Sequence, residues 1–207
     1  MCWSVAEGGP TRGEFMPNLG EELCGEYLRH LKKCQFVTYN VTNPDIQGEI
    51  DVIAINLDKK VLYVCEVAVH TRGLQYVKNS RPDDYDRFVS ELEKDITYAE
   101  RYFKGYQIIP MIWSPIVKIS LGKAKYDTLN ELHRVVEHVR EKYRLEVELI
   151  INHKFSQAMD ELKEVAGSET SEFKSNVMRM FQIEKTLEKH LQILSTRNNG
   201  NHNSARN

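Results

Sequence analysis

Two acidic residues occur inside apolar segments that are predicted to be β-strands. Asp51 lies in the segment 48–55, and Glu66 follows fifteen residues later in the apolar segment 61–70. A strand that is apolar on both faces is expected to be covered on both faces, where an unpaired carboxylate costs several kcal/mol. Because a divalent cation shared by two carboxylates removes that cost, the pair predicts a metal site on two neighbouring strands.

The residues after Glu66 are also placed by strand alternation. Ala68 and His70 are expected on the same face as Glu66. His70 is therefore a candidate for contact with a phosphate, a metal-bound water or Glu66 itself. The alternative is a histidine at a strand end whose ring is satisfied by a neighbouring side chain.

Helical and strand periodicities alternate along the part of the chain that carries these acids. Apolar residues at helical spacing predict two further helices beside a helix over 19–31, and alternating or continuous apolar runs predict the strands. The expected order is helix 19–31, strand 34–41, turn 43–45, strand 49–56, strand 60–70, helix 82–103 with Pro82 in its first turn, strand 107–120, helix 129–139 and strand 146–152. This order predicts an α/β domain with a mixed β-sheet and helices on both faces.

The pattern changes after this domain. From Lys154 onward only helical spacing is found, with a break at Gly167 and Ser168. The predicted organisation is a flexible N-terminal arm 1–17, an α/β domain 18–152, a helical extension 153–196 and a disordered tail 197–207. The extension could pack on the sheet domain, pair with a second copy or contact another partner, and the sequence alone leaves these three open.

Composition limits the class of protein. The 207 residues carry 28 basic and 30 acidic side chains, a net charge of -2, which neither indicates nor excludes a nucleic-acid partner. No segment approaches the roughly 20 apolar residues that span a bilayer, and no secretory signal is found. The four cysteines lack CxxC spacing, which favours reduced thiols. We therefore expect a cytoplasmic protein with no membrane contact and a possible homodimer.

The acids and the first helix together resemble a known pattern. The segment 20–28 reads GEELCGEYL, the segment 48–51 reads GEID, and Glu66 is followed by Val67 and Ala68. This arrangement resembles the PD-(D/E)XK nuclease superfamily, which includes restriction endonucleases and Holliday-junction resolvases. The resemblance covers about residues 18 to 115 and implies a restriction endonuclease-like fold. The position of the superfamily lysine falls on Ala68.

The resemblance implies metal-dependent hydrolysis of phosphodiester bonds, with DNA as the expected substrate. Asp51, Glu66 and the backbone carbonyl of Val67 would bind Mg²⁺ or Mn²⁺, and Glu21 would contribute directly or through water. Hard oxygen ligands suit Mg²⁺, and a bound Mg²⁺ activates water and neutralises charge on the phosphoryl group. Arg72, two residues beyond its place in the superfamily pattern, is a candidate phosphate contact.

Three explanations of Ala68 remain open. The catalytic cation has moved to the long helix or the segment before it, with Lys94, Arg87 and Lys78 as candidates and the latter two also as nucleic-acid contacts. Alternatively, the chain is a catalytically inactive module that binds nucleic acid or protein. In the third explanation, a lysine was replaced by alanine deliberately.

Each acid also has a structural explanation. Asn18 followed three residues later by Glu21 is a helix-capping arrangement, so Glu21 could serve the helix alone. Asp51 could pair with a lysine at a strand end, and Glu66 could form a buried ion pair. Three further acids, which fall in the first turn of the long helix, are expected to complement its dipole: Asp83, Asp84 and Asp86.

Overall fold

The computed structural model describes residues 17–42, 48–78, 81–119 and 127–204. The predicted N-terminal arm up to residue 16 and the predicted turn 43–45 lie outside these ranges. The main sheet has the strand order β1-β2-β3-β6-β7. Its strands are β1 Phe36–Thr42, β2 Glu49–Asn56, β3 Val61–Val67, β6 Gln107–Ser114 and β7 Glu148–Ile151. The first three strands are antiparallel, and β3, β6 and β7 run parallel, which confirms the predicted mixed sheet.

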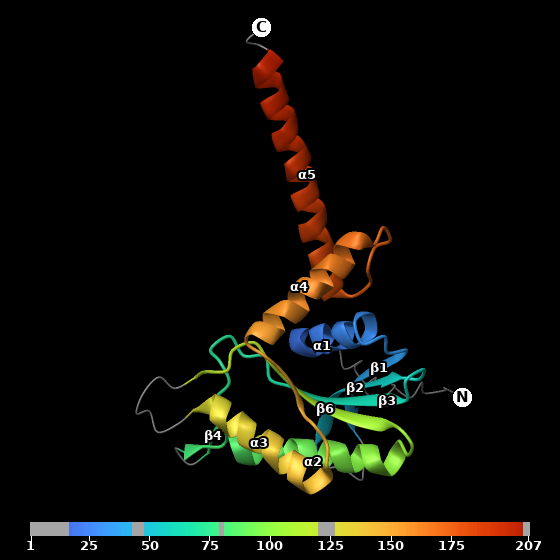
Figure 1. Cartoon of the computed structure of the whole chain (residues 1–207), viewed down its shortest axis with the longest axis vertical. Coiled ribbons are helices and arrows are strands. Elements are labelled where there is room, and N and C mark those ends of the chain that lie inside the picture. Colours follow the sequence, from blue (N-terminus) through green and yellow to red (C-terminus); the bar gives the residue numbers. More distant parts are fainter. Residues whose placement is uncertain (1–16, 43–47, 79–80, 120–126, 205–207) are drawn as a thin grey trace, which may run out of the picture.

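Helices cover both faces of this sheet (Figure 1). One face carries α1 and α4, the other carries α2 and α3, and α5 projects away from the body of the molecule (Figure 1). The helices are α1 Leu19–His30, α2 Asp84–Tyr102, α3 Thr128–Tyr143, α4 His153–Ser168 and α5 Asn176–Ser204. Within the described ranges, no helix combines the length and the apolar character that crossing a bilayer requires.

Alternation along the central strands divides the core into layers. Val52, Tyr63 and Cys65 pack under α1 and α4, whereas Ile53 and Val64 pack on the face covered by α2. The central strands β3 and β6 are therefore apolar on both faces because both faces are covered by helices. This burial is what makes a carboxylate on β3 costly.

Helix α1 lies close to the sheet because two of its residues lack side chains. A Cβ atom on Gly25 would lie 2.1 Å from the hydroxyl oxygen of Tyr39 on β1. A Cβ atom on Gly20 would lie 2.5 Å from a methyl carbon of Val69, just beyond β3. The N-terminus of α1, with Glu21, is thereby held against the end of β3.

Two local predictions differ from the structure. Pro82 lies in β5 (Arg81–Pro82), which pairs with β4 (Val77–Lys78), rather than in the first turn of a helix. The main-chain bond from the Asp83 N–H to the carbonyl of Tyr76 continues this hairpin, so α2 begins only at Asp84. At the other end of the chain, α5 continues to Ser204 and includes most of the predicted disordered tail, because an anchored helix can propagate into polar sequence.

Three of the four cysteines lie in the described part of the chain. Cys24, Cys34 and Cys65 are buried and unbridged, as predicted for structural thiols. Burial raises the pKa of Cys34 to about 11 and that of Cys65 well above its ordinary value. Cys34 and Cys65 therefore remain protonated and act as small apolar groups in the core.

Candidate functional site: a carboxylate cluster where two strands separate

Asp51 and Glu66 lie at the point where strands β2 and β3 stop pairing. The antiparallel register ends at the pair Val52 and Cys65, and the two acids are the next residues on their strands. Instead of entering the ladder with β2, the Val67 N–H donates a hydrogen bond of 2.7 Å to the Asp51 carboxylate. The carboxylate of Asp51 thus occupies the opening between the strands and is held by the backbone beside Glu66.

Glu66 is a buried acid in an electronegative environment. Its residue surface is only 7% exposed, on the face of the sheet covered by α2. Burial raises its pKa well above the ordinary value, and the nearby charges of Asp51, Asp95 and Glu91 act in the same direction. The Lys94 ammonium opposes them without restoring an ordinary pKa. Glu66 therefore lacks a fully compensating cation within the described protein.

Asp51 shares this environment. Burial raises its pKa to about 6, while the hydrogen bond from Val67 lowers it and the charges of Glu21 and Glu49 raise it. Glu21 and Glu49 come from the start of α1 and the start of β2. Together with β3, which carries Glu66, three elements therefore place carboxylates near the separation of the strands. A site of this kind favours the binding of a cation or of a proton.

Helix α2 contributes a further buried acid, Asp95, that sequence reasoning did not single out. Its side chain is fully buried, and both carboxylate oxygens lack a hydrogen-bond donor among the described residues. Burial raises the pKa of Asp95 to about 8, against the lowering effect of Lys94, whose ammonium nitrogen lies 3.6 Å away. The helical stripe predicted this residue's position on α2 but not its contacts, because those depend on how α2 packs.

Lys94 is the one of the three proposed cations that lies within the cluster. Its ammonium pairs with Glu91 and Asp95 and donates to the backbone carbonyl of Glu49. Burial lowers the pKa of Lys94, but the hydrogen bond to Glu91 and the charges of Asp95 and Glu66 outweigh it, so that its pKa is raised. Lys94 therefore stays charged beside Glu66, although its ion pairs among the described residues are with its own helix.

Glu21 has the capping role that its spacing indicated. The Asn18 side chain accepts hydrogen bonds from the N–H groups of Gly20 and Glu21, and the Glu21 carboxylate accepts from the Asn18 N–H at 3.0 Å. Glu21 is also buried, and its charge acts on Asp51. The capping box therefore fixes an acidic side chain near the separation of β2 and β3.

His70 lies beyond the end of the strand that the sequence predicted over 60–70, so alternation from Glu66 does not fix the direction of its side chain. Strand β3 ends at Val67, although the Ala68 N–H still bonds to the carbonyl of Trp113, and His70 is exposed. Its ring nitrogen Nε2 lies 3.3 Å from the hydroxyl of Tyr76. The backbone after Ala68 turns away because it forms the connection to the β4–β5 hairpin, so strand periodicity no longer applies.

Tyr76 links His70 to the acids and was not predicted. Burial raises the pKa of Tyr76, the guanidinium of Arg87 lowers it, and the charges of Glu66 and Asp51 raise it. The guanidinium of Arg87 lies 4.0 Å from the centre of the Tyr76 ring. His70, Tyr76 and Arg87 therefore form a contiguous group beside the carboxylates.

The position of Tyr76 is fixed by a buried acid of α2. The Tyr76 N–H donates a hydrogen bond of 2.7 Å to Asp84, which is almost completely buried. Asp84 thus holds the preceding loop in addition to standing in the first turn of α2, the only role that the sequence suggested for it. The remaining predicted phosphate contacts, Arg72 and Lys78, are exposed on the segment between β3 and α2.

Ala68 is part of the apolar core. Its residue surface is 2% exposed, and it belongs to the buried cluster that contains Leu74 and Phe88. Among the residues that the structure describes, no group of three or more histidine, cysteine or acidic side chains is arranged to hold a metal ion. A metal site here would therefore rest on fewer protein carboxylates together with backbone oxygen, water or substrate.

The chain was also compared with known proteins. No family model matches it, and no curated protein or solved structure is detectably similar to it.

Proposed function

We propose that the chain is a metal-dependent nuclease that hydrolyses phosphodiester bonds, with DNA as the expected substrate. The observation that carries this proposal is the placement of Asp51 and Glu66 on either side of the separation of β2 and β3. Burial and neighbouring acids raise the pKa of both carboxyl groups, so an added cation would stabilise their ionised forms. The superfamily resemblance in the sequence supports the same assignment.

The donor set suits a hard divalent cation. Asp51, Glu66 and the carbonyl oxygen of Val67 would hold Mg²⁺ or Mn²⁺, which commonly bind through one or two carboxylates, with water and substrate phosphate as the other ligands. A full cage of three or more acidic side chains is therefore not required. When bound, the ion would lower the pKa of a water and neutralise charge on the phosphoryl group. The Asp95 oxygens have no hydrogen-bond donor among the described residues and face the Lys94 ammonium at 3.6 Å, which supports a shortage of positive charge around these acids.

Lys94 takes the role of a cation near the reacting phosphate in this proposal. Its ammonium stays charged and acts on Glu66 from α2, whereas Ala68 on β3 supplies only a methyl group. Arg87, stacked on Tyr76, and the exposed Arg72 and Lys78 would contact the phosphate backbone outside the cluster. Such contacts are independent of sequence, so the proposal does not include base recognition.

A second candidate function is a catalytically inactive nucleic-acid-binding or protein-interaction module. The packing of Ala68 in the apolar core favours it, because the position two residues beyond Glu66, where the superfamily lysine falls, is filled as a core position. In this alternative the acids are structural, and Lys94 serves only to hold α2 to β2 through the backbone carbonyl of Glu49. Metal affinity separates the two functions before any substrate is chosen.

The first experiment measures Mg²⁺ and Mn²⁺ binding by calorimetry and by the shift in thermal midpoint. The nuclease proposal predicts binding that is lost in Asp51→Asn and Glu66→Gln. Asp160→Asn, an equivalent change at an exposed acid on α4, should bind the metal as the parent chain does. Equal binding by all four chains would exclude the carboxylate pair as the metal site.

The second experiment measures cleavage of supercoiled plasmid, linear duplex, branched DNA and RNA. Cutting that is lost in Asp51→Ala and in Lys94→Ala, and that returns when Ala68→Lys is added to Lys94→Ala, would support a relocated cation. Cutting only by Ala68→Lys would mean that metal binding is intact and the catalytic cation is missing. Metal binding without cutting by any of these chains would favour the inactive module.

A further inference from the structure

Helix α5 has two separate apolar faces. One face packs within the chain against α4 and α1. The buried residues of this face are Val177, Met178, Phe181 and Gln182. The helix then continues well beyond α4 and extends from the body of the molecule (Figure 1).

The second face is a continuous exposed stripe. Its members are between 40% and 64% exposed, whereas the buried residues of the first face are at most 8% exposed. The stripe consists of Met180, Ile183, Leu187, Leu191 and Leu194. At about 100° per residue, these five side chains fall within an arc of about 80°, centred about 150° around the helix from the packed face. Single exposed apolar residues need no explanation, but an aligned row over about four turns does.

The spacing of the stripe is that of a helix that pairs with another helix. Met180, Leu187 and Leu194 are seven residues apart and occupy the first position of successive heptads. Ile183, three residues after Met180, occupies the fourth position. His190 falls on the next fourth position. The average spacing of 3.5 residues keeps the stripe directed at a partner helix instead of winding around α5.

We propose that the stripe pairs with the same stripe of a second copy of this chain, in a parallel two-stranded coiled coil. The argument for a second copy comes from the charges beside the stripe. Arg179 and Glu184 flank it on opposite sides and are five residues apart, the separation at which residues face each other across a parallel pair. Within the chain Arg179 pairs with Glu172 and Glu184 pairs with Lys163, both near the surface, where such pairs contribute little to stability. In the dimer Arg179 instead faces Glu184 of the partner subunit, and the twofold axis forms this contact twice.

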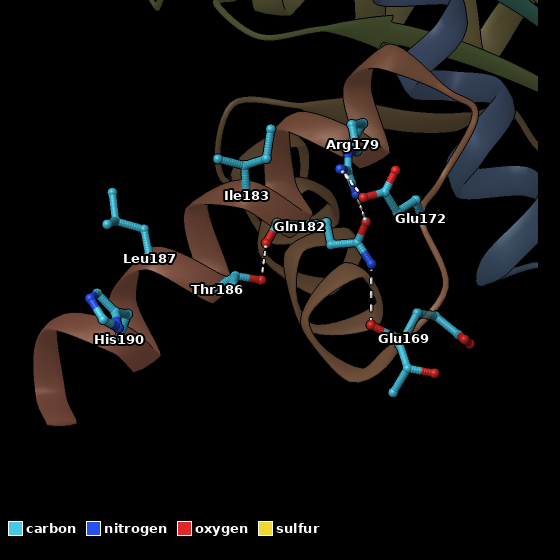
Figure 2. A pocket seen from close by; sticks show the side chains of 9 residues that line it. Glu169, Glu172, Arg179, Gln182, Ile183, Thr186, Leu187 and His190 are labelled. Atoms are coloured by element: carbon cyan, nitrogen blue, oxygen red, sulfur yellow. Dashed lines mark hydrogen bonds and ion pairs between the residues drawn. The ribbon is translucent and has the colours of Figure 1, made fainter.

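The surroundings of the stripe leave room for this partner. A hollow of about 660 Å³ lies between α5 and the connection from α4, lined on one side by Glu169 and Glu172. Ile183 and Leu187 project from α5 at its border, as Figure 2 shows. The stripe residues stay exposed beside this hollow, so α4 does not cover them.

Pairing also requires no new folding. About 21 Å of helix between Met180 and Leu194 is short for an isolated coiled coil, since helices of this length are marginal alone. Here α5 is already held by α4 and α1, so the helix is formed before the partner arrives. We expect a reversible dimer with a dissociation constant in the micromolar range.

Sedimentation equilibrium of the full chain over the micromolar range tests the proposal, which predicts a monomer–dimer equilibrium. Leu187→Glu, which places a carboxylate from each copy at the seam, should weaken the dimer by at least about 100-fold. Gln192→Glu adds the same charge to an exposed position outside the stripe and should leave the dimer unchanged. A monomer at all concentrations, or a dimer that Leu187→Glu leaves intact, would overturn the proposal.

Cross-linking tests the parallel direction. In a chain that carries Cys2→Ser, Met180→Cys alone should form a disulfide-linked dimer on mild oxidation, and Gln192→Cys should not. Antiparallel pairing would instead link Met180→Cys to Leu194→Cys when the two variants are mixed. That second result would refute the parallel arrangement.

Discussion

The buried carboxylate of Asp95 makes the free energy of unfolding depend on pH in a predictable direction. Burial raises its pKa from the ordinary 3.8 to about 8. Between these two values the folded protein keeps a proton that the unfolded chain releases, so stability falls as pH rises through this window. Asp95→Asn removes the titrating group while keeping nearly the same shape, and should abolish this contribution.

The size of the effect follows from the difference between the two pKa values. A pH of about 7 is roughly three units above the ordinary pKa of an aspartate. At about 1.4 kcal/mol per unit, Asp95 therefore lowers the free energy of unfolding at this pH by up to about 4 kcal/mol. The side-chain amide that Asp95→Asn introduces would also lack hydrogen-bond partners. This destabilises the variant by about 1–3 kcal/mol at every pH and offsets part of its gain. The stability difference between variant and parent should therefore shift by about 2–3 kcal/mol in favour of the variant between about pH 5 and pH 7.

Urea unfolding of the parent chain and Asp95→Asn across this pH range measures the difference directly. Asp160→Asn, at an exposed position on α4, serves as the control and should follow the parent at each pH. If the profiles of Asp95→Asn and the parent were parallel, Asp95 would titrate normally, and the charge argument for the carboxylate cluster would fail. Mg²⁺ is omitted in this experiment so that no metal ion compensates the carboxylates.

Three further changes test contacts that position the candidate site. Asn18→Ala removes the cap of α1 and should lower the free energy of unfolding by about 1 kcal/mol, measured in urea. Gly25→Ala places a methyl group against the hydroxyl of Tyr39 and should cost about 1–3 kcal/mol in the same assay, part of which Tyr39→Leu should restore. Asp84→Ala leaves the Tyr76 N–H without its acceptor, so exchange of that amide hydrogen should accelerate while the amides of β6 stay protected; unchanged exchange would show that the loop is held by other contacts.

The elements of the fold could be predicted because their signals are local. The helix 19–31, the hairpin 49–70 and the long helix after it were each marked by capping residues, turn residues and apolar spacing. The end of β3 at Val67 was not marked, because the segment after it remains apolar. Pro82 was misplaced because a proline is compatible both with a strand at an edge and with a first helical turn.

The site was predictable only in part for a different reason. Asp51 and Glu66 could be found because a carboxylate inside an apolar strand is costly to bury and therefore requires a partner. Asp95 and Tyr76 could not be found, since an acid on an amphipathic helix and a tyrosine in a loop are both ordinary until the packing is known. Their roles arise from contacts between α2, the loop before it and the open end of β2, which no spacing in the sequence encodes.

The charge balance at the site connects metal affinity to the missing lysine. Lys94 is the cation closest to Asp51, Glu66 and Asp95 that the described interactions identify. A lysine introduced at Ala68 would add a second cation beside Glu66 and reduce the negative potential that attracts a metal. In a nuclease, Ala68→Lys should therefore weaken metal binding even where it increases cleavage. In an inactive module the same change should produce no cleavage, and the relief of repulsion among the acids would be set against the cost of placing a lysine in the apolar core around Ala68. The opposite responses of metal affinity and cleavage distinguish a catalytic site from a structural one more sharply than either measurement alone.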